Sequence, residues 1–218
     1  MHPFEYFAPT SVSEAIRLLA EGGDGARPLA GGTDLTTQMK EGRRRCDRVV
    51  DLKRIPELTQ IAFDPQSGLS LGAAARCEAI YHHPAVRQHY PAVAASTSLI
   101  GSVQIQNRAS LGGNLCNAAP SADGVPALIV HGAQAVIRGP DGTRRLPVEE
   151  VCTGPGRTCL APGEILVAFE LPLPPPRTAS HYLRFIPRNE MDIAVAGVGA
   201  SLTLDPTGQK CVGARIAL

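Results

Sequence analysis

The sequence predicts an α+β protein made of one large domain and a smaller second one. Three observations lead to this prediction. Residues 1–50 alternate between strand-like and helix-like segments, and a longer, less periodic stretch follows from about residue 59 to 171. Pro172-Leu173-Pro174-Pro175-Pro176 then forms a stiff connector, because proline removes a backbone donor and favours an extended chain. The residues beyond it read as strands, and about forty of them are too few to bury a large core, so the second domain is expected to be incomplete.

The N-terminal segment is expected to form a strand, helix, strand, helix, strand unit. Its first helix is predicted from about residue 12 to 21, because Ser11-Val12-Ser13-Glu14 matches a capping box and apolar residues follow at helical spacing. Gly22-Gly23 ends this helix, since glycine adopts the left-handed cap conformation at low cost. The other elements are strands near 5–7, 27–30 and 48–52 and a short helix near 35–40.

The middle stretch is expected to hold strands near 70–74, 133–138 and 165–171. The alanine-rich segment 85–99 suits a buried helix, and a second helix is predicted from a Ser121 cap to His131. Pro140-Asp141-Gly142-Thr143 has the composition of a hairpin turn. Beyond the connector, strands are predicted at 181–186, 195–204 and 211–218.

The composition excludes several classes of function. Lys and Arg number 21 and Asp and Glu number 20, a formal net charge of +1 that offers no net field for nucleic acid or an anionic membrane. No apolar run approaches the roughly 18 residues of a membrane span, and the first residues lack the basic and apolar regions of a signal peptide. The six cysteines include no C-x-x-C pair, so the chain is not expected to build a zinc or iron–sulfur site alone. A soluble protein that is not exported is expected.

Two Gly-Gly pairs carry the strongest functional signal. Gly31-Gly32-Thr33-Asp34 separates a predicted strand from a predicted helix, and Ser110-Leu111-Gly112-Gly113-Asn114 lies in a later polar stretch. Glycine lets backbone N–H groups converge on a phosphate because it has no side chain and tolerates positive φ. One such pair is most often an ordinary turn, whereas two indicate a pyrophosphate held from both sides. Neither pair has the Lys-Ser or Lys-Thr of a P-loop, and Gly197-Val198-Gly199 lacks the third glycine of a dinucleotide fingerprint and is assigned to the core.

A basic cluster, Glu41-Gly42-Arg43-Arg44-Arg45, is interpreted as a solvated loop. The alternative interpretation makes it a docking surface for a partner subunit. His82-His83 precede Pro84 at a predicted helix boundary, and no metal role is expected for them.

The glycine-containing segments resemble those of a known family. The match runs from Leu29 to Leu35 and from Gln106 to Asp123, including an Asn-x-x-Pro-x-x-Asp tail. These residues are similar to the FAD-binding medium subunit of molybdenum hydroxylases, a family that includes the carbon monoxide dehydrogenase medium chain and the flavin domain of xanthine dehydrogenase. The resemblance implies an FAD-binding domain of the p-cresol methylhydroxylase type over residues 1–171, with subdomains at about 1–55 and 56–171. A proline-rich linker at 172–177 and the start of an incomplete C-terminal α+β domain at 178–218 would follow.

The resemblance also implies where FAD binds. Residues around both glycine pairs would cradle the pyrophosphate and adjoining groups: Leu29, Ala30, Gly31, Gly32, Thr33, Asp34 and Leu35, with Ser110, Leu111, Gly112, Gly113 and Asn114. Asp123 would accept hydrogen bonds from FAD hydroxyls, Leu166 would supply a backbone or apolar contact, and Arg184 would lie near the flavin end. Ile100 stands where xanthine dehydrogenase-like chains have an aromatic residue. Arg184 stands where some relatives have Lys, a cation of different geometry.

On this resemblance the chain is expected to be a cytoplasmic electron-transfer flavoprotein subunit with no catalytic residue and no metal of its own. A large partner chain would carry molybdopterin and a small one would carry two [2Fe-2S] clusters, in a heterotrimer or a dimer of heterotrimers. Electrons would pass from the clusters through FAD to NAD, oxygen or a quinone-like acceptor. Two alternatives remain open: a flavin-free scaffold subunit of the same complex, and a stand-alone flavin oxidase.

Overall fold

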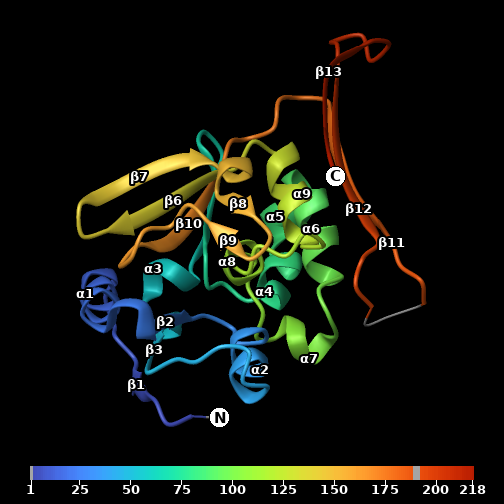
Figure 1. The fold of residues 1–218 in the computed structure, drawn as a ribbon. Helices are drawn as coiled ribbons and strands as arrows, with labels where there is room; N and C mark the ends of the chain where they lie inside the picture. The colour runs from blue at the N-terminus through green and yellow to red at the C-terminus, as the bar shows by residue number, and fades with distance from the viewer. Residues whose placement is uncertain (1, 189–191) are drawn as a thin grey trace.

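The computed structural model describes residues 2–188 and 192–218, which form three main sheets with helices between them (Figure 1). The N-terminal sheet is parallel, with the order β1-β3-β2. Its unit consists of β1 (Glu5–Phe7), α1 (Val12–Gly22), β2 (Ala26–Leu29), α2 (Leu35–Lys40) and β3 (Arg48–Asp51), with a 3-10 turn at Gly23–Gly25. The Ser11 hydroxyl accepts a hydrogen bond from the Glu14 backbone N–H at 3.3 Å, which confirms the predicted cap of α1. The predicted order of elements in this unit is also confirmed.

The central sheet is antiparallel, with the order β4-β5-β10-β6-β7. Its strands are β4 (Ile61–Asp64), β5 (Gly68–Gly72), β6 (Gln134–Gly139), β7 (Gly142–Pro147) and β10 (Ile165–Leu171), and a short ribbon pairs β8 (Cys152–Gly154) with β9 (Arg157–Thr158). Strand β10 is buried on both faces. Its Leu166 and Phe169 pack into the main core, whereas Ile165 and Val167 pack into a second core with α1. This one strand therefore joins the two cores.

Several short helices gather on one side of the central sheet (Figure 1). They are α4 (Cys77–His82), α5 (Pro84–His89), α6 (Pro91–Ser98), α7 (Val103–Gln106), α8 (Leu111–Cys116) and α9 (Gly124–Val130). A single-turn helix, α3 (Pro56–Thr59), and 3-10 turns at Leu52–Arg54 and Val148–Glu150 connect the strands. The buried Leu111, Leu115 and Leu128 on α8 and α9 form much of the main core with β10.

Two helix predictions are wrong in detail, and the second glycine pair lies in a helix. The single helix predicted over 85–99 is two helices, because Tyr90 precedes Pro91 and takes φ −131° and ψ 54°. The helix predicted from a Ser121 cap begins at Gly124 instead. The second glycine pair does not form a turn: it lies in the first turn of α8, which Ser110 caps by accepting a hydrogen bond from the Gly113 N–H at 3.1 Å.

The C-terminal sheet is antiparallel and consists of β11 (Thr178–Phe185), β12 (Ala196–Leu204) and β13 (Cys211–Ala217). One face packs on α6 and α9. The other face is open within the described residues and carries large apolar side chains, among them Leu183, Phe185 and Ile216. The mixture of helices and strands confirms the predicted α+β class. The division of the chain at about residue 55 and at 172–177 stays a prediction.

Candidate functional site

The two glycine-containing segments lie against each other, although they are far apart in the chain. A Cβ atom on Gly31 would lie 2.0 Å from the Arg108 carbonyl oxygen, just before the cap of α8. Arg108 Nε also donates a hydrogen bond to the Gly31 carbonyl oxygen at 3.4 Å. Any side chain at position 31 would push the two segments apart, so glycine is needed here for close approach of two backbones.

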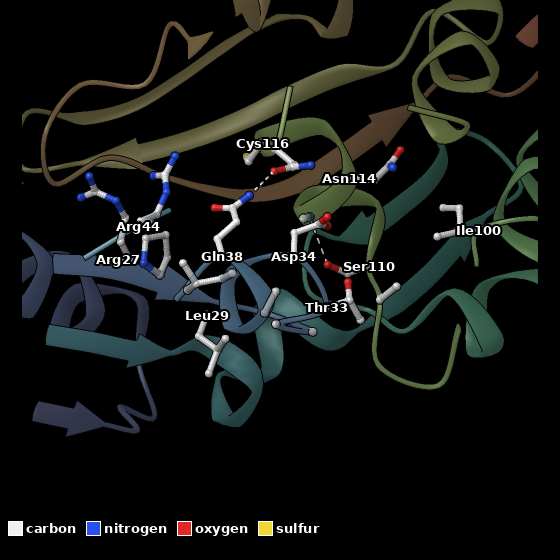
Figure 2. Close-up of a pocket in the computed structure, with 18 of the residues that line it drawn as sticks. Arg27, Leu29, Thr33, Asp34, Gln38, Arg44, Ile100, Ser110, Asn114 and Cys116 are labelled. Atoms are coloured by element: carbon white, nitrogen blue, oxygen red, sulfur yellow. Dashed lines mark hydrogen bonds between the residues drawn. The ribbon is translucent and has the colours of Figure 1, made fainter. Parts of the chain in front are cut away.

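The two segments enclose a pocket of about 280 Å³ (Figure 2). Most of the predicted site residues line it: Leu29, Ala30, Gly31, Gly32, Thr33, Asp34, Leu35, Ile100, Ser110, Gly113 and Asn114. In Figure 2, Ile100 lies at one end of the pocket, and Arg27 and Arg44 lie together at the other. The pocket therefore has an apolar end and a cationic end, with the glycine-containing loop between them.

The loop from Gly31 to Leu35 holds a row of backbone N–H groups along this pocket. None of these N–H groups donates a hydrogen bond to another described residue, and the first paired one belongs to Thr36, which donates to the Gly32 carbonyl oxygen at 3.1 Å. Consecutive backbone N–H groups without a protein acceptor form a binding site for an anion. The loop is therefore suited to a phosphate.

The α8 side of the pocket adds polar side chains. Ser110 Oγ accepts the capping hydrogen bond from Gly113, which leaves its hydroxyl hydrogen free to donate to a ligand. Asn114 Oδ1 accepts a hydrogen bond from the Gly124 backbone N–H at 3.0 Å, so the amide nitrogen of Asn114 remains a donor. These groups complement the N–H row on the opposite wall.

Two predicted residues of α8 lie behind the pocket wall. Leu111 is 1% exposed and belongs to the main core. The Gly112 N–H donates to the Ala73 carbonyl oxygen at 3.0 Å, and a Cβ atom on Gly112 would lie 2.4 Å from that oxygen. Gly112 therefore lets α8 approach the end of β5, and its N–H group is already paired.

A hydrogen bond between two polar side chains connects the walls, and a carboxyl group lies nearby. Gln38 Nε2 on α2 donates to Asn117 Oδ1, just after α8, at 3.2 Å (Figure 2). Asp34 precedes α2 and its side chain makes no capping hydrogen bond. Neighbouring protein atoms desolvate the Asp34 carboxyl and raise its pKa, although the residue as a whole is exposed.

Sequence reasoning missed several residues of the pocket: Arg27, Pro28, Gln38, Arg44, Ala109, Cys116, Asn117, Gly156 and Thr158. Asn117 lies inside the second motif, which is a signal that could have identified it. Arg44 belongs to the cluster interpreted as a solvated loop. Gln38 and Thr158 belong to no motif, so only the fold brings them to the pocket.

Besides Leu111 and Gly112, three predicted residues lie outside this pocket. Leu166 lines a narrow apolar cavity of about 110 Å³, which shares Ala30 and Gly113 with the pocket. Asp123 and Arg184 form an ion pair of 3.2 Å with side chains 12% and 8% exposed, and the Tyr182 hydroxyl donates to the other Asp123 oxygen at 2.8 Å. Both oxygens of Asp123 already accept a protein donor. Arg184 Nε is buried and has no hydrogen-bond partner among the described residues.

A larger, mainly apolar pocket of about 640 Å³ lies beside Tyr182. Adjacent residues line the two pockets where α8 ends, since Asn117 lines the first pocket and Ala118 lines the larger one. Ala118 has a φ of 48°, a left-handed conformation that residues other than glycine seldom adopt and that is common at functional sites. The Gly156 N–H holds this conformation by donating to the Ala118 carbonyl oxygen at 2.9 Å.

The two described ranges contain neither a metal-binding cluster nor a membrane-spanning helix. No group of three or more His, Cys, Asp or Glu residues there could hold a metal ion. All six cysteines are free, and burial raises the pKa of Cys116, in the wall of the first pocket, to about 12. No helix in these ranges is long and apolar enough to span a membrane.

The fold and the paired glycine segments define a class of protein whose pocket is suited to a phosphate-bearing cofactor. Residues 2–174 match the family model described as "FAD binding domain in molybdopterin dehydrogenase", and the chain belongs to this family. It is 35% identical over 201 residues to a putative xanthine dehydrogenase FAD-binding subunit of Escherichia coli, covering 92% of this chain and 68% of that protein. It is 33% identical over 216 residues to the carbon monoxide dehydrogenase medium chain of Afipia carboxidovorans, covering 99% of this chain and 73% of that protein. Carbon monoxide dehydrogenase from Hydrogenophaga pseudoflava has a similar solved structure, with a TM-score of 0.93 and 31% identity over 100% of this chain and 75% of that one.

These comparisons confirm the predicted family, the fold class and FAD as the cofactor. The protein is an oxidoreductase subunit of the molybdenum hydroxylase type. The observed geometry fits FAD, because the unpaired N–H row suits a diphosphate and the larger pocket is mainly apolar.

Proposed function

We propose that this chain holds FAD within a complex and passes electrons from [2Fe-2S] clusters on a small partner chain to an external acceptor. A large partner chain would carry molybdopterin, and the assembly would be a cytoplasmic heterotrimer or dimer of heterotrimers. The names of the relatives support partner chains of other sizes, since two are medium chains of carbon monoxide dehydrogenase. When bound, FAD supplies the one-electron and two-electron chemistry that this transfer requires.

The observation that carries the proposal is that adjacent residues, Asn117 and Ala118, line the two pockets. We assign the diphosphate to the N–H row of Gly31 to Leu35 and to the Ser110 hydroxyl, and the flavin ring to the larger apolar pocket. Ile100, Gly113 and Asn114 would contact the cofactor from the other wall, and Leu111 and Gly112 would support that wall from behind. Leu166, in the narrow cavity beside the first pocket, completes the proposed set together with Asp123 and Arg184. The Asp123 carboxylate accepts a hydrogen bond from Tyr182, which lines the larger pocket.

The relatives also support a role away from the organic substrate. Their names refer to xanthine, nicotinate and carbon monoxide, which are chemically unrelated compounds. A subunit that is similar in all three suits a shared step rather than substrate recognition. We therefore assign no acid or base of this chain to the oxidation of the substrate.

The test uses the intact complex purified from its native source. The complex is denatured, the released flavin is identified and its amount is compared with that of this chain. We expect one FAD per chain. We also expect the organic substrate to bleach the flavin absorbance in the intact complex and to leave it unchanged in the isolated FAD-loaded chain.

Two other results would contradict the proposal. An intact, active complex without flavin would support the scaffold alternative. Oxidation of the organic substrate by the isolated chain would support the stand-alone oxidase.

A further inference from the structure

Two arginine side chains form the cationic end of the first pocket. Arg27 comes from β2 and Arg44 from the loop after α2, and Figure 2 shows them side by side. The following inference rests on the proposed function, because it concerns the ligand of this same pocket.

The three consecutive arginines of the basic cluster have different surroundings. Arg43 pairs with Glu41, and Arg45 pairs with Asp47 at 3.2 Å. The guanidinium of Arg44 has no carboxylate or carbonyl partner in the part of the chain that the structure describes, and it lines the pocket. The Arg44 backbone N–H donates to the Gln38 carbonyl oxygen at 3.2 Å, which fastens the loop to α2. Two of the three charges are therefore neutralised at the surface, while the third faces the pocket.

Arg27 is oriented by the protein rather than neutralised by it. Its Nη1 donates to the carbonyl oxygens of Asp24 at 3.0 Å and Ala26 at 2.6 Å. No carboxylate in the described ranges pairs with it. Burial raises the pKa of the Cys46 thiol, and the charges of Arg27 and Arg44 both oppose that shift, so the two cations act on the same small region.

The other charged group of the pocket is the Asp34 carboxyl, which lies nearer the middle (Figure 2). A diphosphate carries about two negative charges, and backbone N–H groups supply only partial positive charges. An arginine without a protein partner supplies a full charge and a planar pair of donors suited to phosphate oxygens.

We propose that Arg44 is a direct ligand of the cofactor diphosphate, with Arg27 held beside it to increase the local positive charge. Arg44 thus belongs to the cofactor site and not to a solvated loop or to a surface that docks a partner subunit.

The experiment measures the dissociation constant of FAD for the full chain after its flavin has been removed, by fluorescence titration at low and high salt. Arg44→Gln should weaken FAD binding on the order of tenfold at low salt, because it removes one charge-assisted hydrogen bond. The loss should shrink in about 1 M salt, where screening reduces the interaction between exposed charges. Arg44→Lys should recover part of the affinity.

The neighbouring arginines provide matched controls. Arg43→Gln and Arg45→Gln remove the same charge from the same loop and should leave the FAD dissociation constant within about twofold, since long-range effects of exposed charges are screened. Equal melting temperatures of the flavin-free variants would show that all of them fold.

Three outcomes would overturn the inference. Equal affinities of the Arg44→Gln and Arg43→Gln variants would remove Arg44 from the site. A loss that does not depend on salt would indicate stacking on a ring of the cofactor in place of a phosphate contact. A wild-type chain that binds no FAD would reject the proposed function as well, so the two failures can be told apart.

Discussion

At residue 31 the absence of a side chain allows two segments that are distant in the chain to pack against each other. A Cβ atom added to Gly31 would lie 2.0 Å from the Arg108 carbonyl oxygen. This oxygen and the Cα that would carry the Cβ both belong to the backbone, so neither can move aside as a flexible side chain could. We expect Gly31→Ala to weaken FAD binding at least about tenfold, because a displacement of about 1 Å in either wall disrupts the cradle. FAD titration of the flavin-free chain measures this effect.

Gly213 supplies the control for that substitution. A Cβ there would meet its nearest atom, on Thr203, at 3.6 Å, an ordinary contact distance. Gly213→Ala should therefore leave FAD affinity unchanged. Wild-type affinity in the Gly31→Ala chain would show that the two segments tolerate separation, and the assigned cradle would be wrong.

At the scale of elements, strand β11 is fastened to both ends of helix α9. Asp123, just before α9, pairs with Arg184 of β11, and His131, just after α9, forms a hydrogen bond of 2.9 Å with Ser180 of β11. Both contacts are largely buried, so breaking either one leaves a polar group without a partner away from water. This should lower the free energy of unfolding more than breaking an exposed pair would.

The ion pair at the start of α9 leads to a stability prediction. Arg184→Met leaves the buried Asp123 carboxylate without its cation, and we expect the free energy of unfolding to fall by about 3 kcal/mol. The double variant Asp123→Asn/Arg184→Met should be less destabilised, since it removes the buried charge as well. Urea unfolding measures both. Arg145→Met, which breaks an exposed pair with Glu170, should cost under about 1 kcal/mol. Equal losses at Arg184 and Arg145 would contradict the buried role.

The contact at the end of α9 leads to a pH prediction. Burial, with a smaller effect of the Arg215 charge, lowers the pKa of His131 from 6.5 to about 4. Ser180 Oγ accepts a hydrogen bond from the Ala92 N–H at 3.2 Å and shares a second hydrogen bond of 2.9 Å with His131 Nε2. Between pH 6.5 and about 4 the unfolded chain binds a proton that the folded chain does not. The free energy of unfolding should therefore decrease by about 3 kcal/mol as the pH falls through this window.

A substitution distinguishes the contribution of His131 to this pH dependence from that of other titrating groups. His131→Asn should remove most of the loss between pH 6.5 and 4 in unfolding experiments. His181→Gln, at an exposed position of β11, should keep the wild-type pH dependence. An unchanged slope in His131→Asn would show that another group is responsible.

At the scale of the whole molecule, cofactor binding and folding are coupled. The pocket is built from the N-terminal unit on one side and from α8 on the other, so bound FAD would stabilise both together. Free FAD at about 100 times its dissociation constant adds about 2.7 kcal/mol to the free energy of unfolding. For a protein of this size we expect a rise in melting temperature of roughly 5–10 °C.

Riboflavin, which lacks the diphosphate, is the comparison ligand for this thermal experiment. It should raise the melting temperature much less than FAD at the same concentration, because it leaves the N–H row of the Gly31 loop unpaired. Equal shifts would contradict the assignment of the diphosphate to that loop. The absence of any shift with FAD would favour the flavin-free scaffold.

Much of the fold and part of the site could be predicted from the sequence. Helix α1 and its Ser11 cap were predictable because a capping box acts over four residues. Pro91 is a local signal for the helix break at Tyr90. The prediction of one helix over 85–99 gave more weight to the alanine-rich composition than to this proline. Strand β7 was missed because its side chains are mainly polar and exposed, so it has no apolar alternation to detect.

The sequence by itself determined the elements of the N-terminal unit, the two glycine motifs and, through them, the family, because each depends on residues close together in the chain. Only the tertiary structure decided that Gly112 packs against Ala73 while Gly113 lines the pocket, and that Arg44 lines the pocket while Arg43 and Arg45 face solvent. The two glycines, and likewise the three arginines, are neighbours of the same residue type, so the sequence does not distinguish them. They differ in their surroundings in the folded chain. The backbone that lies opposite each residue is set by contacts between segments distant in the chain, such as Gly31 with Arg108 and Gly112 with Ala73, which no local pattern encodes.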